Sequence, residues 1–348
     1  MRIGVGMHRN APDDWESALT FAIEAERMGA DSIWSGEAWG WDGATQLAYL
    51  ASQTSTIRLG TSIMKIGARS PALTAGTAMA LASMTNDRFV LGLGTSTPQI
   101  MEAWDGVDFE RPIRRSRELI EIIRLVESGE RLVYDGDIHQ IPLREELRPM
   151  RTRAGARRLP IYVASVGPQN LRMTGELCDG WIGNCFVPET AGAFLDHIRD
   201  GAESVGRSLD DLELQVPVTL EFDDDLDALA KRHAVGYAFT FGAMGEPGRN
   251  FYVEAFARQG FEEVREVHRL WINGQRAEAQ DLVPVAIALQ TNLLGNDDFI
   301  KERLRAYRDV GIDSLRVGLR GDSIEDYLND LGRLLDLVKE VDAEEDGA

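Results

Sequence analysis

The sequence is poor in cysteine and in positive charge. Its 348 residues include two cysteines, Cys178 and Cys185, which are too few for a disulfide framework. Lysine and arginine number 37 against 57 aspartates and glutamates, and the net charge is −20. An acidic surface disfavours nucleic acids and anionic membranes as partners, because both reward basic patches.

Long hydrophobic runs and targeting signals are missing as well. No apolar run approaches the ~18 residues of a membrane span, and the chain starts directly with strand-like sequence rather than a signal peptide. We therefore expect a cytoplasmic protein without membrane contact. Hydrophobic residues still make up 44% of the chain, which is enough for a sizeable core.

Short apolar runs alternate with helical patterns along most of the chain. The runs that predict strands are Arg2–Met7, Ser32–Ser35, Ile57–Met64, Phe89–Leu93, Ile161–Ala164, Gly180–Gly183, Leu212–Glu221 and Ser314–Leu319. Eight strand–helix units predict an α/β fold, a (β/α)8 TIM barrel with insertions, as a single domain over residues 1–348. A doubly wound sheet is the alternative, but it normally has about six strands. Between the fourth strand and Glu110 we expect a loop.

Two segments interrupt the alternation. Residues 129–159 predict a hairpin that turns at Asp135-Gly136, followed by an arginine-rich stretch. Residues 225–284 are mostly helical in pattern and carry several aromatic residues, so we expect them to cover the substrate site as a lid.

The stretch Pro160–Gln169 predicts a strand, a tight turn and a helix with Pro168 in its first turn. Free backbone N–H groups at such a positive helix end suit a phosphate. An ordinary strand-to-helix connection explains the same pattern, so the segment alone leaves both interpretations open.

In a barrel, the chemistry belongs at the carboxyl ends of the strands. The residues expected there are Met7, His8, Glu37, Trp39, Ser62, Ile63, Met64, Thr95, Ser96, Ser165, Gly167, Asn184 and Cys185. They include neither a carboxylate pair nor a Cys/His cluster with metal spacing, so we expect no metal site. A mouth of this kind suits a planar aromatic cofactor that brings its own reactivity.

Four motifs in fixed order make the chain recognisable: Ser35–Asp42, Leu59–Lys65, Arg88–Ser96 and Pro160–Pro168. Together they resemble the luciferase-like flavin and deazaflavin superfamily. The nearest branch is the coenzyme F420-dependent oxidoreductases, which include methylenetetrahydromethanopterin reductase and its actinobacterial relatives. The resemblance implies a (β/α)8 barrel with insertions, coenzyme F420 as cofactor and a homodimer.

The resemblance also implies a set of cofactor-binding residues. A non-prolyl cis peptide between Ser62 and Ile63 would form a bulge behind the cofactor ring. The turn around Gly167 would meet the cofactor's phosphate. The full implied set is Met7, Ser62, Ile63, Met64, Thr95, Ser96, Ser165, Val166, Gly167, Pro168, Asn184 and Cys185.

The proton donor is less well defined. Several relatives have an acidic residue followed by histidine after the second strand, whereas here Glu37 is followed by alanine. Glu37, His8 and Trp39 are the catalytic candidates. Each also has a structural interpretation: Glu37 as part of a salt bridge, His8 as a structural histidine and Trp39 as a core aromatic residue. The arginines at 144–158 either guide the anionic tail of the cofactor or form a solvated loop.

The function that follows from the resemblance is hydride transfer between deazaflavin and a small organic substrate, such as a carbonyl, an imine, an activated alkene or an alcohol. One alternative is an FMN-dependent luciferase-like monooxygenase that uses oxygen. A second is a non-catalytic flavin- or deazaflavin-binding protein.

Overall fold

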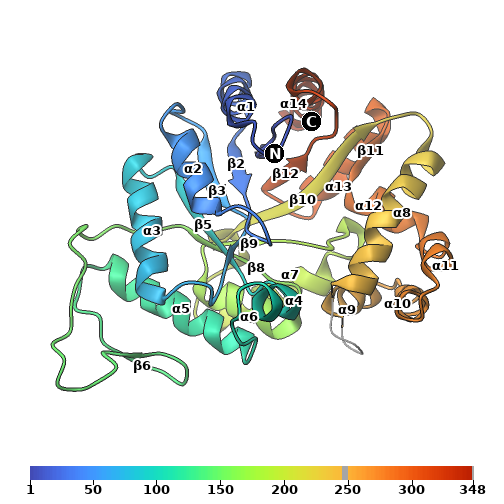
Figure 1. Cartoon of the computed structure of the whole chain (residues 1–348). Coiled ribbons are helices and arrows are strands. Elements are labelled where there is room, and N and C mark those ends of the chain that lie inside the picture. Colours follow the sequence, from blue (N-terminus) through green and yellow to red (C-terminus); the bar gives the residue numbers. More distant parts are fainter. Residues whose placement is uncertain (245–249, 347–348) are drawn as a thin grey trace.

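Eight parallel strands form a closed barrel in the computed structural model, which describes residues 1–244 and 250–346 (Figure 1). The strands are β1 (Arg2–Gly6), β2 (Ser32–Ser35), β3 (Arg58–Thr61), β5 (Phe89–Gly94), β8 (Ile161–Ala164), β9 (Gly180–Ile182), β10 (Glu213–Phe222) and β12 (Ser314–Gly318). Each pairs with the next, and β12 pairs with β1 to close the ring. The predicted (β/α)8 barrel is confirmed.

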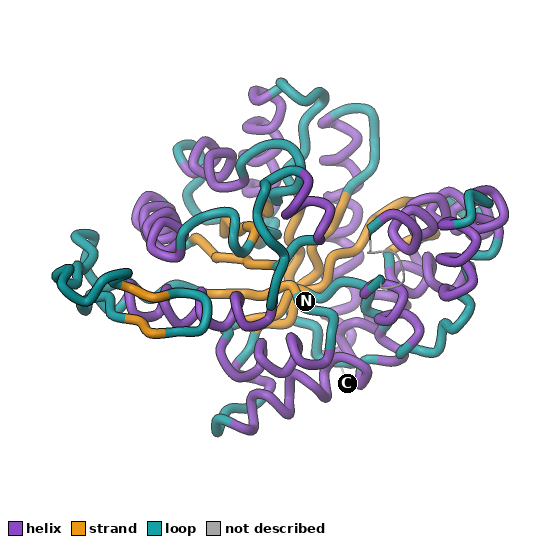
Figure 2. The backbone as a smooth tube through the Cα atoms, turned by 60° about the horizontal axis from the view of Figure 1, so that its bottom comes forward, coloured by secondary structure: helices purple, strands orange, loops and turns teal. Residues whose placement is uncertain are grey.

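Helices surround the barrel (Figures 1 and 2). They are α1 (Trp15–Met28), α2 (Gly43–Ala51), α3 (Pro71–Met84), α5 (Pro112–Glu127), α6 (Pro168–Leu177), α7 (Gly192–Ser204), α13 (Asp297–Asp309) and α14 (Ile324–Asp346). Their ends carry local signals: at α1, Asp14 accepts a hydrogen bond from the backbone N–H of Ser17, and Gly29 ends the helix at φ 94°. Such caps satisfy backbone groups that the helix itself leaves free.

Two elements differ from the sequence-based expectation. The third strand does not run through to Met64: β3 ends at Thr61, and a short strand, β4 (Met64–Lys65), pairs separately with β5. The expected loop before Glu110 contains helix α4 (Pro98–Ala103). Thr97 caps this helix and proline stands in its first turn, a start signal that the sequence carries.

The two insertions lie on opposite sides of the barrel (Figure 2). The first contains the hairpin strands β6 (Tyr134–Asp135) and β7 (Gln140–Ile141). The buried carboxylate of Glu118 on α5 accepts hydrogen bonds from the backbone N–H groups of residues 137–139 and holds the hairpin tip.

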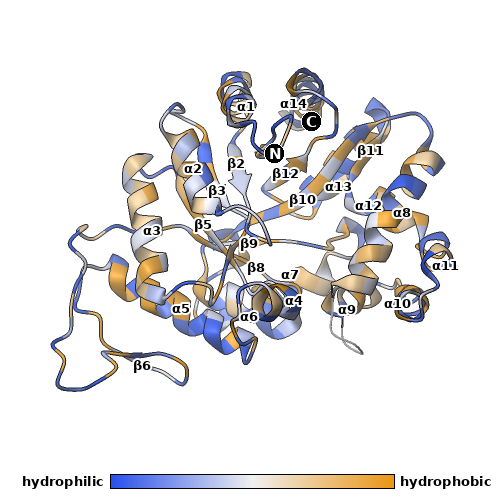
Figure 3. Ribbon diagram, viewed as in Figure 1, coloured by the Kyte–Doolittle hydropathy of each residue, from blue (hydrophilic) through white to orange (hydrophobic). Residues whose placement is uncertain are grey.

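The second insertion is helical. It comprises α8 (Leu226–Ala243), α9 (Phe251–Ala257), α10 (Val264–Ile272) and α11 (Arg276–Asp281), followed by α12 (Val285–Thr291) and a short strand, β11 (Leu293–Gly295), beside β10. Residues 245–249 of the expected lid lie outside the described residues. Hydrophobic residues concentrate on the strands and inward helix faces, while α11 is hydrophilic (Figure 3).

Inside the barrel, a small apolar cluster fills the space between the strands. It consists of Trp34, Val90, Tyr162 and Ile182. The Trp34 ring lies where a side chain on Gly60 would stand, since a Cβ there would be 2.3 Å from the ring. This packing closes the barrel below its carboxyl end. In the described part of the chain, no helix is long and apolar enough to cross a bilayer.

Candidate active site

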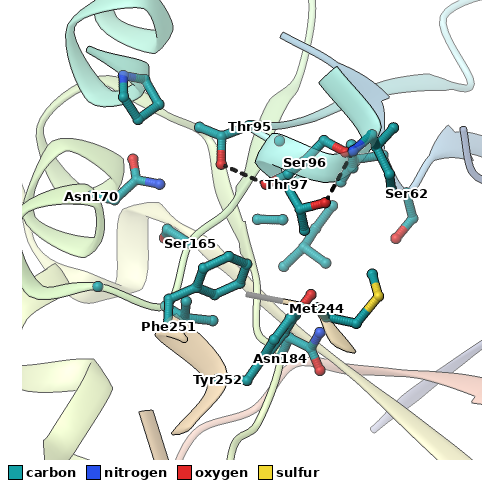
Figure 4. Close-up of a pocket in the computed structure, with 18 of the residues that line it drawn as sticks. Ser62, Thr95, Ser96, Thr97, Ser165, Asn170, Asn184, Met244, Phe251 and Tyr252 are labelled. Atoms are coloured by element: carbon teal, nitrogen blue, oxygen red, sulfur yellow. Dashed lines mark hydrogen bonds between the residues drawn. The ribbon is translucent and has the colours of Figure 1, made fainter. Parts of the chain in front are cut away.

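A cavity of about 500 Å³ opens at the carboxyl ends of the barrel strands. Figure 4 shows Asn170 and Ser165 on one side of the opening and Ser62 across from them, with Tyr252 and Met244 along another edge. Two neighbouring cavities, of about 480 and 440 Å³, extend the space toward β10 and toward the loop after β2. We refer to these as the first, second and third cavity.

The turn between β8 and α6 forms one end of the first cavity. Gly167 is the N-cap of α6 and has no side chain to occupy the free backbone N–H groups. Asn170 is 8% exposed and lines the cavity, and its Oδ1 has no hydrogen-bond partner among the described residues. Arg258 donates to the carbonyl of Val166 and places a cation beside the turn. Helix end, amide and cation together can hold an anion.

Thr95 and Ser96 form the neighbouring wall, directly after β5. Ser96 adopts the left-handed conformation at φ 62°, which is uncommon for a residue with a side chain and is typical of functional sites. The hydroxyl-bearing residues 95–97 thus face the same space as the α6 end, as Figure 4 shows.

The floor of the cavity is apolar. The peptide bond between Ser62 and Ile63 is cis, at the bond that the resemblance indicates. The Ile63 side chain lies against Gly94, where a Cβ would be 2.9 Å from Ile63 Cγ1. Ile63 and Ile182 therefore present a flat aliphatic surface to the cavity, on which a planar ring can rest.

Glu37 lines the first cavity, but its carboxylate is engaged in a salt bridge. Arg69 donates from Nη1 to Oε2 at 2.8 Å and from Nη2 to Oε1 at 2.7 Å. The backbone N–H groups of Gly43 and Lys65 donate to the same carboxylate at 3.3 and 3.2 Å. Glu37 therefore connects the segment after β2 with the segment between β3 and α3 at the barrel mouth, which favours the salt-bridge alternative over a role as acid.

Most of the expected cofactor residues meet at the first cavity. Those that line it are Ser62, Ile63, Thr95, Ser96, Ser165, Val166, Gly167 and Asn184, and the catalytic candidate Glu37 lines it as well. Trp39 lines the second and third cavities, Cys185 the second, and Met7 the third. Burial raises the pKa of the Cys185 thiol, so the thiol is not poised as a nucleophile.

Three expected residues line none of these cavities. His8 lies between α1 and α14, with its ring 5.0 Å from that of Phe21 and 4.6 Å from that of Tyr327. It is not placed for catalysis because its ring packs against these two aromatic side chains and lines none of the three cavities. Met64 is fully buried in the core outside the cavity, and Pro168 is exposed on the outer side of the turn.

Arg157 and Arg158, at the end of the arginine-rich stretch, do not contact the turn at Gly167. Arg158 pairs with Glu127 and Asp179, and Arg157 pairs with Asp87. Asp179 precedes β9, and its carboxylate also accepts a hydrogen bond from the backbone N–H of Ile161 at the start of β8. These contacts lie at the amino ends of the strands, opposite the cavity, so the hypothesis that Arg157 and Arg158 guide a cofactor tail is wrong.

Among the cavity residues that sequence reasoning missed are Asn170 and Arg316. Arg316 had a readable signal: it stands in the middle of the apolar strand Ser314–Gly318, with apolar residues on both sides. Alternation along a strand places such a charge on the opposite face from its neighbours. Asn170 in the first turn of α6 had none beyond its nearness to Gly167.

The cavity fits a planar cofactor with a phosphate. The apolar floor suits a ring, and the α6 end suits an anion. Among residues 1–244 and 250–346, no group of three histidine, cysteine or acidic side chains could hold a metal ion.

Comparison with known proteins identifies the family of the chain. Residues 1–314 match the family model described as luciferase-like monooxygenase. A Mycobacterium tuberculosis protein assigned as a coenzyme F420-dependent oxidoreductase is 32% identical over 90% of this chain and 93% of its own. The 5,10-methylenetetrahydromethanopterin reductase of Methanolobus tindarius is 27% identical over 86% of this chain and 88% of its own.

A solved structure shows the same fold. The coenzyme F420-dependent tetrahydromethanopterin reductase from Methanopyrus kandleri superposes with a TM-score of 0.76, at 20% identity, over 95% of this chain and 97% of that one. The chain therefore belongs to the luciferase-like family, as an enzyme among its F420-dependent oxidoreductases.

Proposed function

We propose that this enzyme binds coenzyme F420 in the first cavity and transfers a hydride between it and a small organic substrate, such as a carbonyl, an imine, an activated alkene or an alcohol. The observation that carries the proposal is the pairing of an anion-binding helix end, at Gly167 and Asn170, with an apolar floor at Ile63 and Ile182. The bound cofactor supplies the hydride chemistry.

The residues of the chain orient the cofactor and exclude water. The α6 end and Asn170 would hold the phosphate, and Ile63 and Ile182 would support one face of the ring. The opposite face would then be open to a substrate from the second cavity, which shares Asn184 and Tyr252 with the first. Fixed placement of two reactants in this way lowers the entropic part of the barrier.

A hydroxyl rather than a carboxylate is the group available to support a substrate oxygen. Glu37 is committed to Arg69. Tyr252 lines both cavities, and burial raises the pKa of its phenol. The phenol therefore remains protonated at neutral pH and can donate a hydrogen bond.

Anaerobic turnover tests the proposal. The purified enzyme is mixed with reduced F420 and a panel of carbonyls, imines and activated alkenes, and cofactor oxidation is followed by absorbance. We expect oxidation that depends on both enzyme and acceptor and does not require oxygen. F420 binding without turnover across the panel would favour the non-catalytic carrier.

The family description leaves an FMN-dependent monooxygenase as the second candidate. The same panel with reduced FMN in air distinguishes the two. Substrate oxygenation that requires oxygen and FMN, with no reaction of reduced F420, would reject the F420 proposal.

A further inference from the structure

Arg316 is the described residue at which all three cavities meet. It stands in the middle of β12, and its strand neighbours are Gly4 on β1 and Pro217 on β10.

No described side chain pairs with this guanidinium. Its Nε is sheltered from solvent and has no hydrogen-bond partner in the described part of the chain. The acid that lines the first cavity and the acid at the start of β10 have cations of their own: Glu37 holds Arg69, and Glu213 holds Arg58 at 2.9 Å. Glu221, on the adjacent strand β10, holds Arg232 at 2.8 Å.

A partly buried cation without a partner lowers the stability of the folded state. Removing a charge from water is strongly unfavourable unless a counter-charge or hydrogen bonds replace the lost hydration. Burial lowers the pKa of Arg316 to about 10, so the side chain is still charged at neutral pH. A bound anion would supply the missing partner, and a guanidinium matches a carboxylate with two parallel hydrogen bonds.

The cofactor's phosphate end is not that anion. The α6 end follows β8, and Thr95 and Ser96 follow β5. In the closed order of strands, β12 lies three strands from β8 and four from β5, which is the far side of the barrel. Arg316 therefore faces the substrate space rather than the phosphate.

The walls beside Arg316 are largely aromatic. The second cavity is lined by Trp39, Phe186, Tyr237, Phe239, Tyr252 and Phe256. Trp39 is 56% exposed at the mouth that it shares with the third cavity. Such walls suit an apolar or aromatic body and offer no second charge for an anion.

We propose that Arg316 binds the carboxylate of the substrate, so that this enzyme acts on carboxylic acids whose apolar body lies against the aromatic wall of the second cavity. The assignment to a substrate rests on the function proposed above.

The test is the binding of benzoate and of its neutral analogue benzamide, measured by calorimetry on the enzyme in the presence and in the absence of F420. We expect benzamide to bind the wild type at least ten times more weakly than benzoate. Arg316→Met should weaken benzoate binding at least tenfold, and Arg316→Lys should restore part of it. The control is Arg320→Met, because Arg320 is exposed, approaches Glu221 at 3.8 Å and lines none of the three cavities.

Equal binding of benzoate and benzamide by the wild type would overturn the proposal without any variant. So would unchanged benzoate affinity in a folded Arg316→Met protein. F420 affinity, measured on the same samples, reports separately on the proposed function. If F420 does not bind but benzoate binding still depends on Arg316, the proposed function fails and the carboxylate site stands.

Discussion

Two arginines at the barrel mouth have opposite situations. Arg69 donates two hydrogen bonds to the carboxylate of Glu37 and also contacts Asp42. Arg316 has no partner among the described residues. A satisfied ion pair fixes geometry, and an unsatisfied cation is available to a ligand. From this contrast we infer that Glu37 stabilises the structure of the site and that Arg316 is available to bind a ligand.

Glu37→Gln should lower the free energy of unfolding by about 1–3 kcal/mol, because it leaves the guanidinium of Arg69 with the more exposed Asp42 as its remaining acidic partner among the described residues. Arg69→Met should cost a similar amount. The double variant should lose clearly less than both losses added together, since the pair is removed as a unit. Urea denaturation followed by circular dichroism measures all three.

If the stability losses of the two single variants simply added up in the double variant, Glu37 and Arg69 would not be an energetically coupled pair. A supporting role also predicts that the pH profile of hydride transfer is the same in the folded double variant as in the wild type. If the double variant lost one limb of the pH profile, Glu37 would instead act as an acid in the reaction.

His8 should make the protein sensitive to moderate acid. Burial lowers the pKa of His8 from 6.5 to about 4 in the folded state. Between these values the unfolded chain binds a proton that the folded chain does not, so stability falls as the pH drops from 6.5 toward 4, by on the order of 2 kcal/mol. His8→Phe should reduce this loss, as measured by denaturation at pH 7 and pH 4.5.

His197→Phe on α7 is the matched control and should retain the wild-type loss. An equally steep acid loss in the His8→Phe protein would show that other groups are responsible.

At the scale of elements, certain glycines mark positions where the backbones of neighbouring elements are in close contact. Gly92 on β5 faces the backbone of β3: a Cβ there would be 1.8 Å from the carbonyl oxygen of Thr61. The Thr61 hydroxyl donates to the Gly92 carbonyl and accepts from its N–H. This side chain thus joins the two strands at the point where β3 ends.

Gly92→Ala should destabilise the protein by at least about 3 kcal/mol, because the backbone has to move to admit a methyl group. Gly76→Ala is the control, since Gly76 lies exposed in α3 and a Cβ at that position would meet nothing within 4 Å. It should stabilise by about 0.5–1 kcal/mol through lower chain entropy. Equal effects of the two changes in urea denaturation would contradict the packing argument.

Substitutions in the first turn of α6 should separate the effect of a charge on ligand binding from its effect on helix stability. Asn170→Asp places a carboxylate beside the proposed phosphate and should weaken F420 binding at least tenfold. The same charge favours a helix N-terminus by about 0.3–1 kcal/mol, so stability should not fall. Fluorescence titration and thermal denaturation measure the two effects.

Gln169→Glu adds the same charge in the same turn, but Gln169 is exposed and lines none of the three cavities. It should change F420 affinity by less than threefold. Equal weakening by both variants would place the phosphate elsewhere.

At the scale of the whole molecule, barrel closure brings together residues that are far apart in the chain. Strand ends could be predicted from the sequence because apolar runs and helix caps are local patterns, and the turn at Gly167 was found in this way. The salt bridge from Glu37 to Arg69 depends on how two loops meet. The location of Arg316 depends on the pairing of β12 with β1.

The errors have the same origin. His8 follows a strand end in sequence, yet it packs between α1 and α14, two helices that meet only when the barrel closes. The arginine stretch follows a hairpin after the chain's fourth strand–helix unit, yet ion pairs with Glu127 and Asp179 hold its end at the face opposite the cavity. Local patterns contain no information about these contacts.

The central claim is that the first cavity binds coenzyme F420. Its most direct test is titration of the purified protein with F420 and, separately, with FMN, followed by quenching of the tryptophan fluorescence. The account predicts micromolar or tighter binding of F420, binding of FMN at least ten times weaker, and weaker F420 binding in Asn170→Asp. Preference for FMN, or binding of neither compound, would contradict it.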